Sequence, residues 1–324
     1  MIVAGIDEAG YGPLLGPLVT ALAAFSAPAG ARDDLWRALR PAVRRRPPER
    51  GAWRALPVVD SKELHRGGKG FADLETVALA FSALASADGR PPETVGAFLG
   101  RHLAGGPLPT ARYPWYGSAL LERPLPRRAD PARIAREAGR LRRAAGRAAV
   151  GVVRIAVRPL LVEEFNRRAA RWGTKARVLF DLNVELLEDL RRRAAAPWRV
   201  RCDRHGGRRR YVELLDGAFP LEGVTVLGEA RERSRYRVGP AATGLELDYV
   251  VGGERQGMEV ALASIFAKYV RELFVGALND HFRGRMADLR PTAGYWSDGL
   301  RFLEDLDRAR VLTEDERRLL VRSR

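Results

Sequence analysis

The sequence predicts a mixed α/β fold. Short apolar runs of the kind that form buried strands are interspersed with longer stretches in which apolar residues recur at helical spacing. The chain has 324 residues, which is enough to bury a sizeable core as one large domain or as two smaller ones. Strands mixed with helices of these lengths are typical of a mixed α/β architecture.

The first predicted strand leads directly into two acidic side chains. Residues 2–6 form an apolar run, and Asp7 and Glu8 follow it. A second apolar run covers residues 18–25, after a turn rich in glycine and proline. Further strands are predicted at residues 58–64, where a short strand ends in a turn, and at residues 150–157, 199–203, 224–227 and 245–251.

Helices are predicted where apolar residues share one face. Such a stripe is formed in residues 71–86 by Phe71, Leu74, Val77, Phe81 and Leu84. The other predicted helices cover residues 131–147, which are strongly basic, residues 175–195, residues 259 to about 282 and, as one or two helices, residues 298–322. The segments expected to be irregular are residues 44–50, a solvated loop, and residues 87–130, an inserted loop or small subdomain with an aromatic cluster at 113–117.

The adjacent carboxylates Asp7 and Glu8 predict a divalent-metal site. Two like charges at the end of a buried strand cost free energy unless a cation or other partners compensate them. The glycines that follow, Gly10, Gly12 and Gly16, allow a ligand to approach the backbone closely. The alternative is an exposed Asp-Glu pair in a turn.

The charge of the chain favours a polyanionic partner. The net charge is +16 and nearly all of the positive charge is arginine, since only four lysines occur. Arginine matches phosphate geometry in a bidentate way, so we expect a nucleic-acid partner. Codon bias is an alternative source of the arginines, because Ala, Gly and Pro are also abundant. It does not explain why acidic residues fail to balance them.

Cysteine usage and the apolar runs indicate the compartment. Cys202 is the only cysteine, which excludes an intrachain disulfide and a thiolate metal cluster. The amino-terminal apolar stretch is short and is broken by Asp7 and Glu8, so we expect no signal peptide. No run approaches about 18 apolar residues, so we expect no membrane span. A cytoplasmic protein fits these features best.

Four carboxylates stand at strand ends or at entries to helices: Asp7, Glu8, Asp203 and Glu254. Magnesium takes oxygen ligands and keeps several waters, so a few carboxylates suffice to bind it. Two such ions can activate a water and stabilise the leaving oxygen of a phosphodiester. Sequence spacing alone does not show that these four side chains meet in space.

Four segments together resemble the ribonuclease HII family. Residues 5–17 (GIDEAGYGPLLGP) resemble its opening motif, and Asp60-Ser61-Lys62 resembles its second signature. Residues 263–272 (ASIFAKYVRE) resemble the helix after its last catalytic acid, and Gly294-Tyr295 followed by Ser297 resembles its substrate-sensing turn. The motifs occur in the family's order, which is a strong signal, whereas any one alone would be weak.

The resemblance implies a ribonuclease H-like fold, with a mixed central sheet flanked by helices and a helical C-terminal part. It implies an endonuclease dependent on Mg²⁺ or Mn²⁺ that cleaves RNA in RNA–DNA hybrids, or ribonucleotides embedded in duplex DNA, leaving 5′-phosphates. The implied catalytic and metal-binding residues are Asp7, Glu8, Asp203 and Glu254. Asp248 is the alternative for the fourth acid. The implied substrate-binding residues are Gly10, Tyr11, Gly12, Lys62, Ser264 and Tyr295.

The chain departs from the family pattern in three ways. Tyr11 replaces the arginine of a Gly-Arg-Gly motif and so loses a guanidinium contact to the substrate. Glu254 replaces the family's usual aspartate. The chain is also longer than the family core, so we expect one catalytic domain over residues 1–324 with insertions at about 28–54, 88–146 and 205–244. Residues 283–324 would form a C-terminal helical extension, and we expect a monomer.

Several residues keep alternative interpretations. For Lys62 the two interpretations are a phosphate contact and a surface lysine in a turn. For Tyr295 they are stacking on a nucleotide and a tyrosine of the core. His205 is a proton shuttle, a phosphate contact or a residue without function. The basic helix at residues 131–147 lies along a duplex or is simply solvated. For the whole chain, the alternatives are a non-catalytic or altered-specificity nucleic-acid-binding relative and another nuclease of the same fold.

Overall fold

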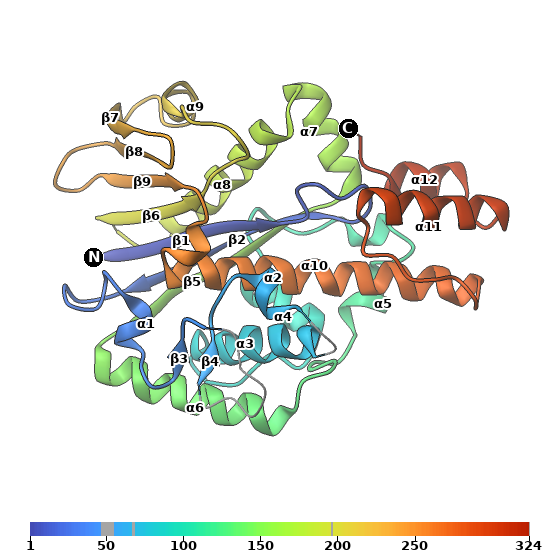
Figure 1. The fold of residues 1–324 in the computed structure, drawn as a ribbon, viewed down its shortest axis with the longest axis horizontal. Coiled ribbons are helices and arrows are strands. Elements are labelled where there is room, and N and C mark those ends of the chain that lie inside the picture. The colour runs from blue at the N-terminus through green and yellow to red at the C-terminus, as the bar shows by residue number, and fades with distance from the viewer. Residues whose placement is uncertain (47–54, 67–68, 196, 324) are drawn as a thin grey trace.

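A seven-stranded mixed sheet forms the centre of the protein (Figure 1). The computed structural model describes residues 1–46, 55–66, 69–195 and 197–323. The strand order is β5-β2-β1-β6-β9-β8-β7, in which β1, β6 and β9 are parallel and the other neighbouring pairs are antiparallel. The strands are β1 (Ile2–Ala9), β2 (Leu18–Ser26), β5 (Gly151–Leu160), β6 (Trp198–Asp203), β7 (Val224–Glu229), β8 (Arg233–Val238) and β9 (Leu245–Val250). The predicted mixed α/β fold is confirmed.

The parallel part of the sheet brings three strand ends to one edge. Ile6 of β1 lies opposite Cys202 of β6, and Cys202 lies opposite Tyr249 of β9. Because the three strands run in the same direction, the residues at their carboxyl ends meet at that edge. Glu8 and Asp203 stand there, at the ends of two adjacent strands.

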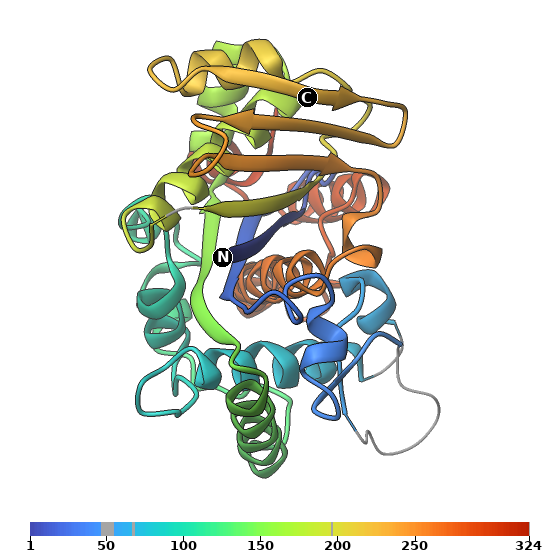
Figure 2. The same ribbon diagram turned by 90° about the vertical axis from the view of Figure 1, so that its left-hand side faces the viewer.

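Helices cover both faces of the sheet, so β1 and β2 are buried on both sides. Val3 and Val19 belong to the core on one face, while Ala4 and Leu22 belong to the core on the other. Figure 2 shows α10 end-on beside the strands of the sheet. The longer helices are α3 (Gly70–Leu84), α4 (Val95–His102), α6 (Pro131–Ala148), α7 (Val162–Trp172), α8 (Lys175–Arg191), α10 (Met258–Arg285) and α11 (Trp296–Arg308).

Two of the shorter helical segments carry candidate site residues. These are α2 (Ser61–Leu64) and the 3₁₀ turn η2 (Gly253–Arg255). The others are α1 (Leu35–Ala38), η1 (Thr110–Arg112), α5 (Gly117–Leu121), α9 (Val212–Ala218) and α12 (Glu314–Leu320), and a second, two-stranded sheet joins β3 (Val43–Arg44) to β4 (Leu56–Pro57).

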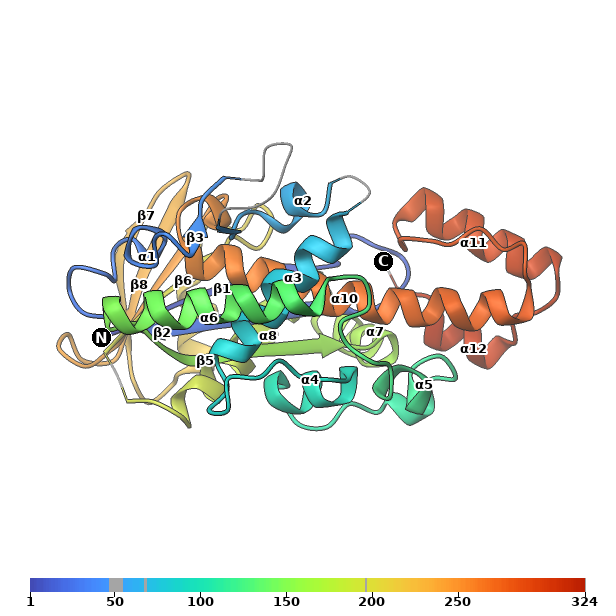
Figure 3. The same cartoon turned by 90° about the horizontal axis from the view of Figure 1, so that it is seen from below.

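Helix α10 connects the sheet to the second helical layer. It packs on β1 and β2 along one side and on α3 along the other, and nearly all of its first 21 residues are buried. Figure 3, a view from below, shows α6 lying outside α3 and α10. Helix α10 is apolar around most of its circumference because it lies between the sheet and the outer layer of helices.

The aromatic cluster at residues 113–117 is part of the main core. Tyr113, Trp115 and Tyr116 are each 1% exposed. Tyr116 lies 4.8 Å, ring to ring, from Phe274 of α10, and Trp115 lies 5.5 Å from Phe282. The cluster therefore anchors residues 87–130 to α10 and does not form a separate subdomain.

Some local predictions were wrong. The turn expected after residue 60 is the helix α2, which begins there because the Asp60 side chain accepts a hydrogen bond from the Lys62 amide at 2.8 Å. Helix α7 and strand β8 were not predicted, and Arg44 lies in a short strand rather than a loop. Residues 47–50 of that expected loop lie outside the described residues.

The C-terminal segment forms two helices and then returns to the turn between β1 and β2. Val321 pairs with Leu15, and the Arg322 amide donates to the Leu14 carbonyl at 2.9 Å. The end of the chain thus lies beside the glycine-rich turn that follows β1. Among the helices of the described residues, none is long and apolar enough to span a membrane.

Candidate active site

A cavity of about 230 Å³ opens at the carboxyl ends of β1 and β6. Its lining includes Ala9, Pro13, Asp60, Ser61 and Lys268. The ten residues that the sequence singled out for catalysis, metal binding or substrate binding also line it: Asp7, Glu8, Gly10, Tyr11, Gly12, Lys62, Asp203, Glu254, Ser264 and Tyr295. The structure therefore brings together side chains that are as far apart in sequence as Asp7 and Tyr295, while their chemical roles stay predictions.

A hydrogen bond places Glu254 beside Asp203. The carboxylate of Asp203 accepts from the Gly253 amide at 2.9 Å, which fixes the turn between β9 and α10. Gly252 has a φ of 64°, in the left-handed region that glycine adopts readily. Glu254 follows in η2 and so lies at the same edge of the sheet as Asp203.

Close packing between β1 and α10 supplies the other wall. A Cβ atom at Gly5 would lie 2.2 Å from the Val260 backbone nitrogen, so only glycine allows this approach. The hydroxyl of Ser264, one turn further along α10, lies 2.9 Å from the hydroxyl of Ser61. This contact joins α10 to α2 and thereby positions Lys62 at the pocket.

The amino-terminal pair of acids carries strongly raised pKa values. Burial, followed by the charges of Glu8 and Asp203, raises the pKa of Asp7 well above its usual range. Burial, followed by the charge of Asp203, raises the pKa of Glu8 to about 8. Both carboxylates are therefore costly to ionise in the protein alone, and a cation in the pocket would relieve that cost.

The pKa values of the other two acids and of Lys62 are also raised. Burial raises the pKa of Asp203, although the hydrogen bond from the Gly253 amide acts to lower it. Burial and the charge of Asp203 raise the pKa of Glu254. Burial alone would lower the pKa of Lys62, but the charges of nearby carboxylates, Asp60 and Asp7 foremost, outweigh that effect. The pKa of Lys62 is therefore raised. Lys62 is thus one positive charge at the pocket that partly offsets the acids.

The donor set fits a hard divalent cation. Carboxylate oxygens are the ligands that Mg²⁺ and Mn²⁺ prefer, and Mg²⁺ commonly binds through one or two carboxylates and several waters. Within the described residues, no three His, Cys, Asp or Glu side chains are already grouped as a metal site. The four acids line one pocket together, and so they are the residues that would hold such an ion.

Asp248, the alternative fourth acid, does not line this pocket. It is 3% exposed in the middle of β9 and forms an ion pair with Arg233 at 2.5 Å. Glu254 occupies the pocket instead, and so the geometry favours it for the fourth position.

His205 and Tyr295 take opposite environments. His205 is 1% exposed, its Nε2 lies 2.7 Å from the Asn183 amide nitrogen, and burial lowers its pKa to about 3. It is therefore a neutral core residue, and the proton-shuttle interpretation loses its support. Tyr295 is 49% exposed at the start of α11, so the core-tyrosine alternative is wrong.

Two buried arginines behind the glycine-rich turn were missed. Arg322 is 2% exposed and donates hydrogen bonds to the carbonyl oxygens of Gly10 and Tyr11. Arg271 is 1% exposed, donates to the Ala293 carbonyl at 2.8 Å and lies over the Tyr295 ring. Burial lowers the pKa of Arg322 to about 9. No local pattern distinguishes Arg322 from the other arginines of this arginine-rich chain.

The solved structures that resemble this chain include ribonucleases HII and HIII. Ribonuclease HII of Archaeoglobus fulgidus, solved in a complex with PCNA, is 16% identical with a TM-score of 0.45, over 100% of this chain and 95% of that chain. Ribonuclease H2 from Pyrococcus horikoshii OT3 is 14% identical with a TM-score of 0.37, over 98% and 97% of the two chains.

The third relative is longer than this chain. Bst-RNase HIII, solved in complex with Mn²⁺, is 15% identical with a TM-score of 0.42, over 99% of this chain but 66% of that chain. No protein-family model and no curated protein matches the sequence. The chain is thus similar to solved ribonucleases HII and HIII over 98–100% of its length, at identities of 14–16%.

Proposed function

We propose that this protein is a metal-dependent endonuclease that cleaves RNA in RNA–DNA hybrids or ribonucleotides embedded in duplex DNA. One observation carries the proposal: four carboxylates from three separate segments, Asp7, Glu8, Asp203 and Glu254, line one pocket together with Lys62. A cluster of acids would repel a nucleic acid unless cations were bound, so the arrangement favours metal-assisted phosphodiester hydrolysis. The choice of ribonucleotide substrates rests on the four sequence motifs.

The four carboxylates would hold one or two Mg²⁺ or Mn²⁺ ions. A divalent ion bound there supplies a water of lowered pKa and neutralises charge on the phosphodiester. Hydrolysis would leave a 3′-hydroxyl and a 5′-phosphate. Lys62, with its charge at the same pocket, would contact a non-bridging phosphate oxygen.

The turn after β1 would bind the nucleotide at the cleavage point. No heavy atom lies within 4 Å of the position that a Cβ atom of Gly12 would occupy, so the backbone there is open to a ligand. Backbone groups at Gly10 and Gly12 are suited to contact the ribose 2′-hydroxyl, which distinguishes RNA from DNA. The exposed Tyr295 ring would stack on a sugar or base, and the Tyr11 hydroxyl would replace the missing guanidinium.

A cleavage assay on three labelled duplexes tests this function. The duplexes are an RNA–DNA hybrid, a DNA duplex with one embedded ribonucleotide and an all-DNA control, each with Mg²⁺, Mn²⁺ or EDTA. We expect cleavage of one or both ribonucleotide substrates with either metal, none with EDTA, and loss of cleavage in Asp7→Asn. Cleavage of the all-DNA control would indicate a different nuclease. Binding without cleavage in either metal would indicate a non-catalytic relative.

The compartment and the oligomeric state are part of the same proposal. Cys202 is buried and is the only cysteine, which suits a reducing cytoplasm. We propose that the protein acts there as a monomer. Sedimentation of the purified protein would report the oligomeric state directly.

A further inference from the structure

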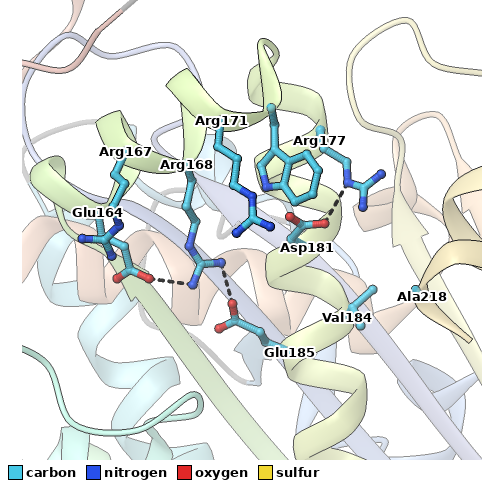
Figure 4. Close-up of a pocket in the computed structure, with 10 residues that line it drawn as sticks. Glu164, Arg167, Arg168, Arg171, Arg177, Asp181, Val184, Glu185 and Ala218 are labelled. Carbon is cyan, nitrogen blue, oxygen red and sulfur yellow. Dashed lines mark hydrogen bonds and ion pairs between the residues drawn. The ribbon is translucent and has the colours of Figure 1, made fainter.

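A second, arginine-rich hollow lies between α7 and α8 (Figure 4). Its volume is about 500 Å³, and Arg167, Arg168, Arg171, Trp172 and Arg177 are among the residues that line it. None of these residues lines the candidate active site. The hollow is therefore a separate feature of the surface.

The acidic side chains at this hollow are already neutralised by arginines. Glu164 and Glu185 each form ion pairs with both Arg158 and Arg168, at 2.5–3.0 Å. This closed ring of two acids and two arginines has no net charge. Asp181 pairs with Arg177 at 2.9 Å, as the dashed line in Figure 4 marks.

Two arginines remain without an acidic partner. Arg167 and Arg171 are exposed on α7, and neither forms an ion pair with a carboxylate in the described part of the chain. Figure 4 shows Arg171 pointing from α7 into the space between the helices. The hollow therefore carries an excess of two positive charges.

An exposed tryptophan holds the guanidinium groups in place. Trp172 is 36% exposed, and the guanidinium carbons of Arg171 and Arg177 lie 4.8 Å and 4.4 Å from its ring centroid. Cation–π contacts of this kind restrict the arginine side chains, so less conformational entropy is lost when an anion binds. Arginine forks positioned in this way suit phosphate groups.

A basic loop lies next to the active site. A further hollow is lined by Tyr11, by Ala176 of α8 and by Arg208, Arg209 and Arg210. Tyr11 also lines the candidate active site, and Ala176 directly precedes Arg177. Arginine side chains are therefore present both beside the catalytic pocket and at the α7–α8 hairpin.

We propose that the hollow between α7 and α8 binds the phosphate backbone of the nucleic acid that flanks the cleavage point. This inference rests on the proposed function, since it assigns a path to the same substrate. A long polyanion fits better than a small anion because arginine side chains line two separate hollows in addition to the active site, and one of these hollows shares Tyr11 with that site. Arg167 and Arg171 would make the outermost phosphate contacts.

Binding measurements with Ca²⁺ in place of Mg²⁺ or Mn²⁺, on probes shown by gel to remain uncleaved, separate this proposal from the proposed activity, because binding needs no cleavage and a cation still neutralises the acids. The probes are labelled DNA duplexes with one embedded ribonucleotide and either short or long flanks on both sides. The test variant is Arg167→Gln/Arg171→Gln. The matched control is Arg37→Gln/Arg40→Gln, which removes the same charge from exposed positions in and just after α1, on the opposite side of the molecule from α7 (Figure 1).

We expect the test variant to bind the long-flanked duplex about tenfold more weakly than wild type. The slope of log K against log salt concentration should be shallower by about two, which corresponds to the loss of about two phosphate contacts. Affinity for the short-flanked duplex should not change, and the control variant should bind both duplexes as wild type does. Equal losses in the two variants would show a general charge effect and overturn the proposal, as would unchanged binding of the long duplex. Circular dichroism would verify that both variants are folded. If the variants show this binding pattern but wild type cleaves neither duplex with Mg²⁺ or Mn²⁺, the proposed endonuclease activity is wrong and the proposed binding surface is still supported.

Discussion

Arg322 donates a hydrogen bond from its guanidinium to the carbonyl oxygen of Gly10, which lies 312 positions earlier in the chain. A second bond from the same guanidinium reaches the Tyr11 carbonyl at 3.3 Å, and the group lies 3.9 Å from the Phe165 ring centroid. A residue close to the C-terminus therefore supports the turn that faces the catalytic pocket.

Replacing Arg322 with methionine should impair the turn without removing a pocket side chain. We expect kcat to fall about tenfold to a hundredfold, because small displacements of a binding turn are costly to the reaction. The free energy of unfolding should fall by about 1–3 kcal/mol, since two partly buried carbonyl groups lose their donor. Cleavage kinetics and urea unfolding would measure both effects. Arg318→Met, at a 78% exposed side chain of α12, should alter neither.

Glu254 and Asp248 should behave differently when their charge is removed. Glu254→Gln should abolish cleavage while the melting temperature stays close to that of wild type, because Glu254 lines the pocket and makes no ion pair in the described structure. Asp248→Asn should retain cleavage and lose stability, since it leaves Arg233 without its partner. Thermal melts and cleavage rates on the same preparations test the pair. The reverse pattern would assign the fourth acid to Asp248.

The contact between β1 and α10 should tolerate no side chain at Gly5. We expect Gly5→Ala to lower the free energy of unfolding by about 3 kcal/mol or more, because the added methyl group would overlap the Val260 backbone. Gly100→Ala is the control, since its Cβ position is open and alanine favours a helix by up to about 1 kcal/mol. Denaturant unfolding of both variants measures the difference. Equal stabilities would show that β1 and α10 can separate.

The neutral, buried His205 predicts a pH-dependent contribution to stability. Its pKa is lowered from 6.5 to about 3, so below pH 6.5 the unfolded chain takes up a proton that the folded chain does not. The free energy of unfolding therefore loses about 1.4 kcal/mol per pH unit from this residue as the pH falls. Glu8, with its raised pKa, contributes the opposite slope, so the diagnostic quantity is the difference from a variant.

Urea unfolding of wild type and His205→Gln at pH 7.5, 6.5 and 5.5 measures that difference. The destabilisation caused by the variant should be constant from pH 7.5 to 6.5 and shrink by about 1 kcal/mol from 6.5 to 5.5. A destabilisation that does not depend on pH would mean that His205 is protonated in the folded protein.

Residues close together in sequence were predictable. The strand that carries Asp7 and Glu8, the helix at residues 71–86 and the basic helix at residues 131–147 follow from hydrophobic periodicity, and each is present. Helix α7 was missed because its apolar face is short and interrupted by charged residues. Strand β8 was missed because arginines occupy alternate positions of an otherwise ordinary strand.

The sequence by itself determined the mixed α/β class, the arginine excess and the ten candidate site residues, since local pattern and motif spacing record them. Only the tertiary structure decided that these residues share one pocket, that Glu254 rather than Asp248 lines it, and that Arg322 supports it. The physical reason is that parallel pairing of β1 and β6 and the packing of α10 on β1 bring distant segments together. Such contacts depend on the whole folded chain and leave no mark in the local sequence.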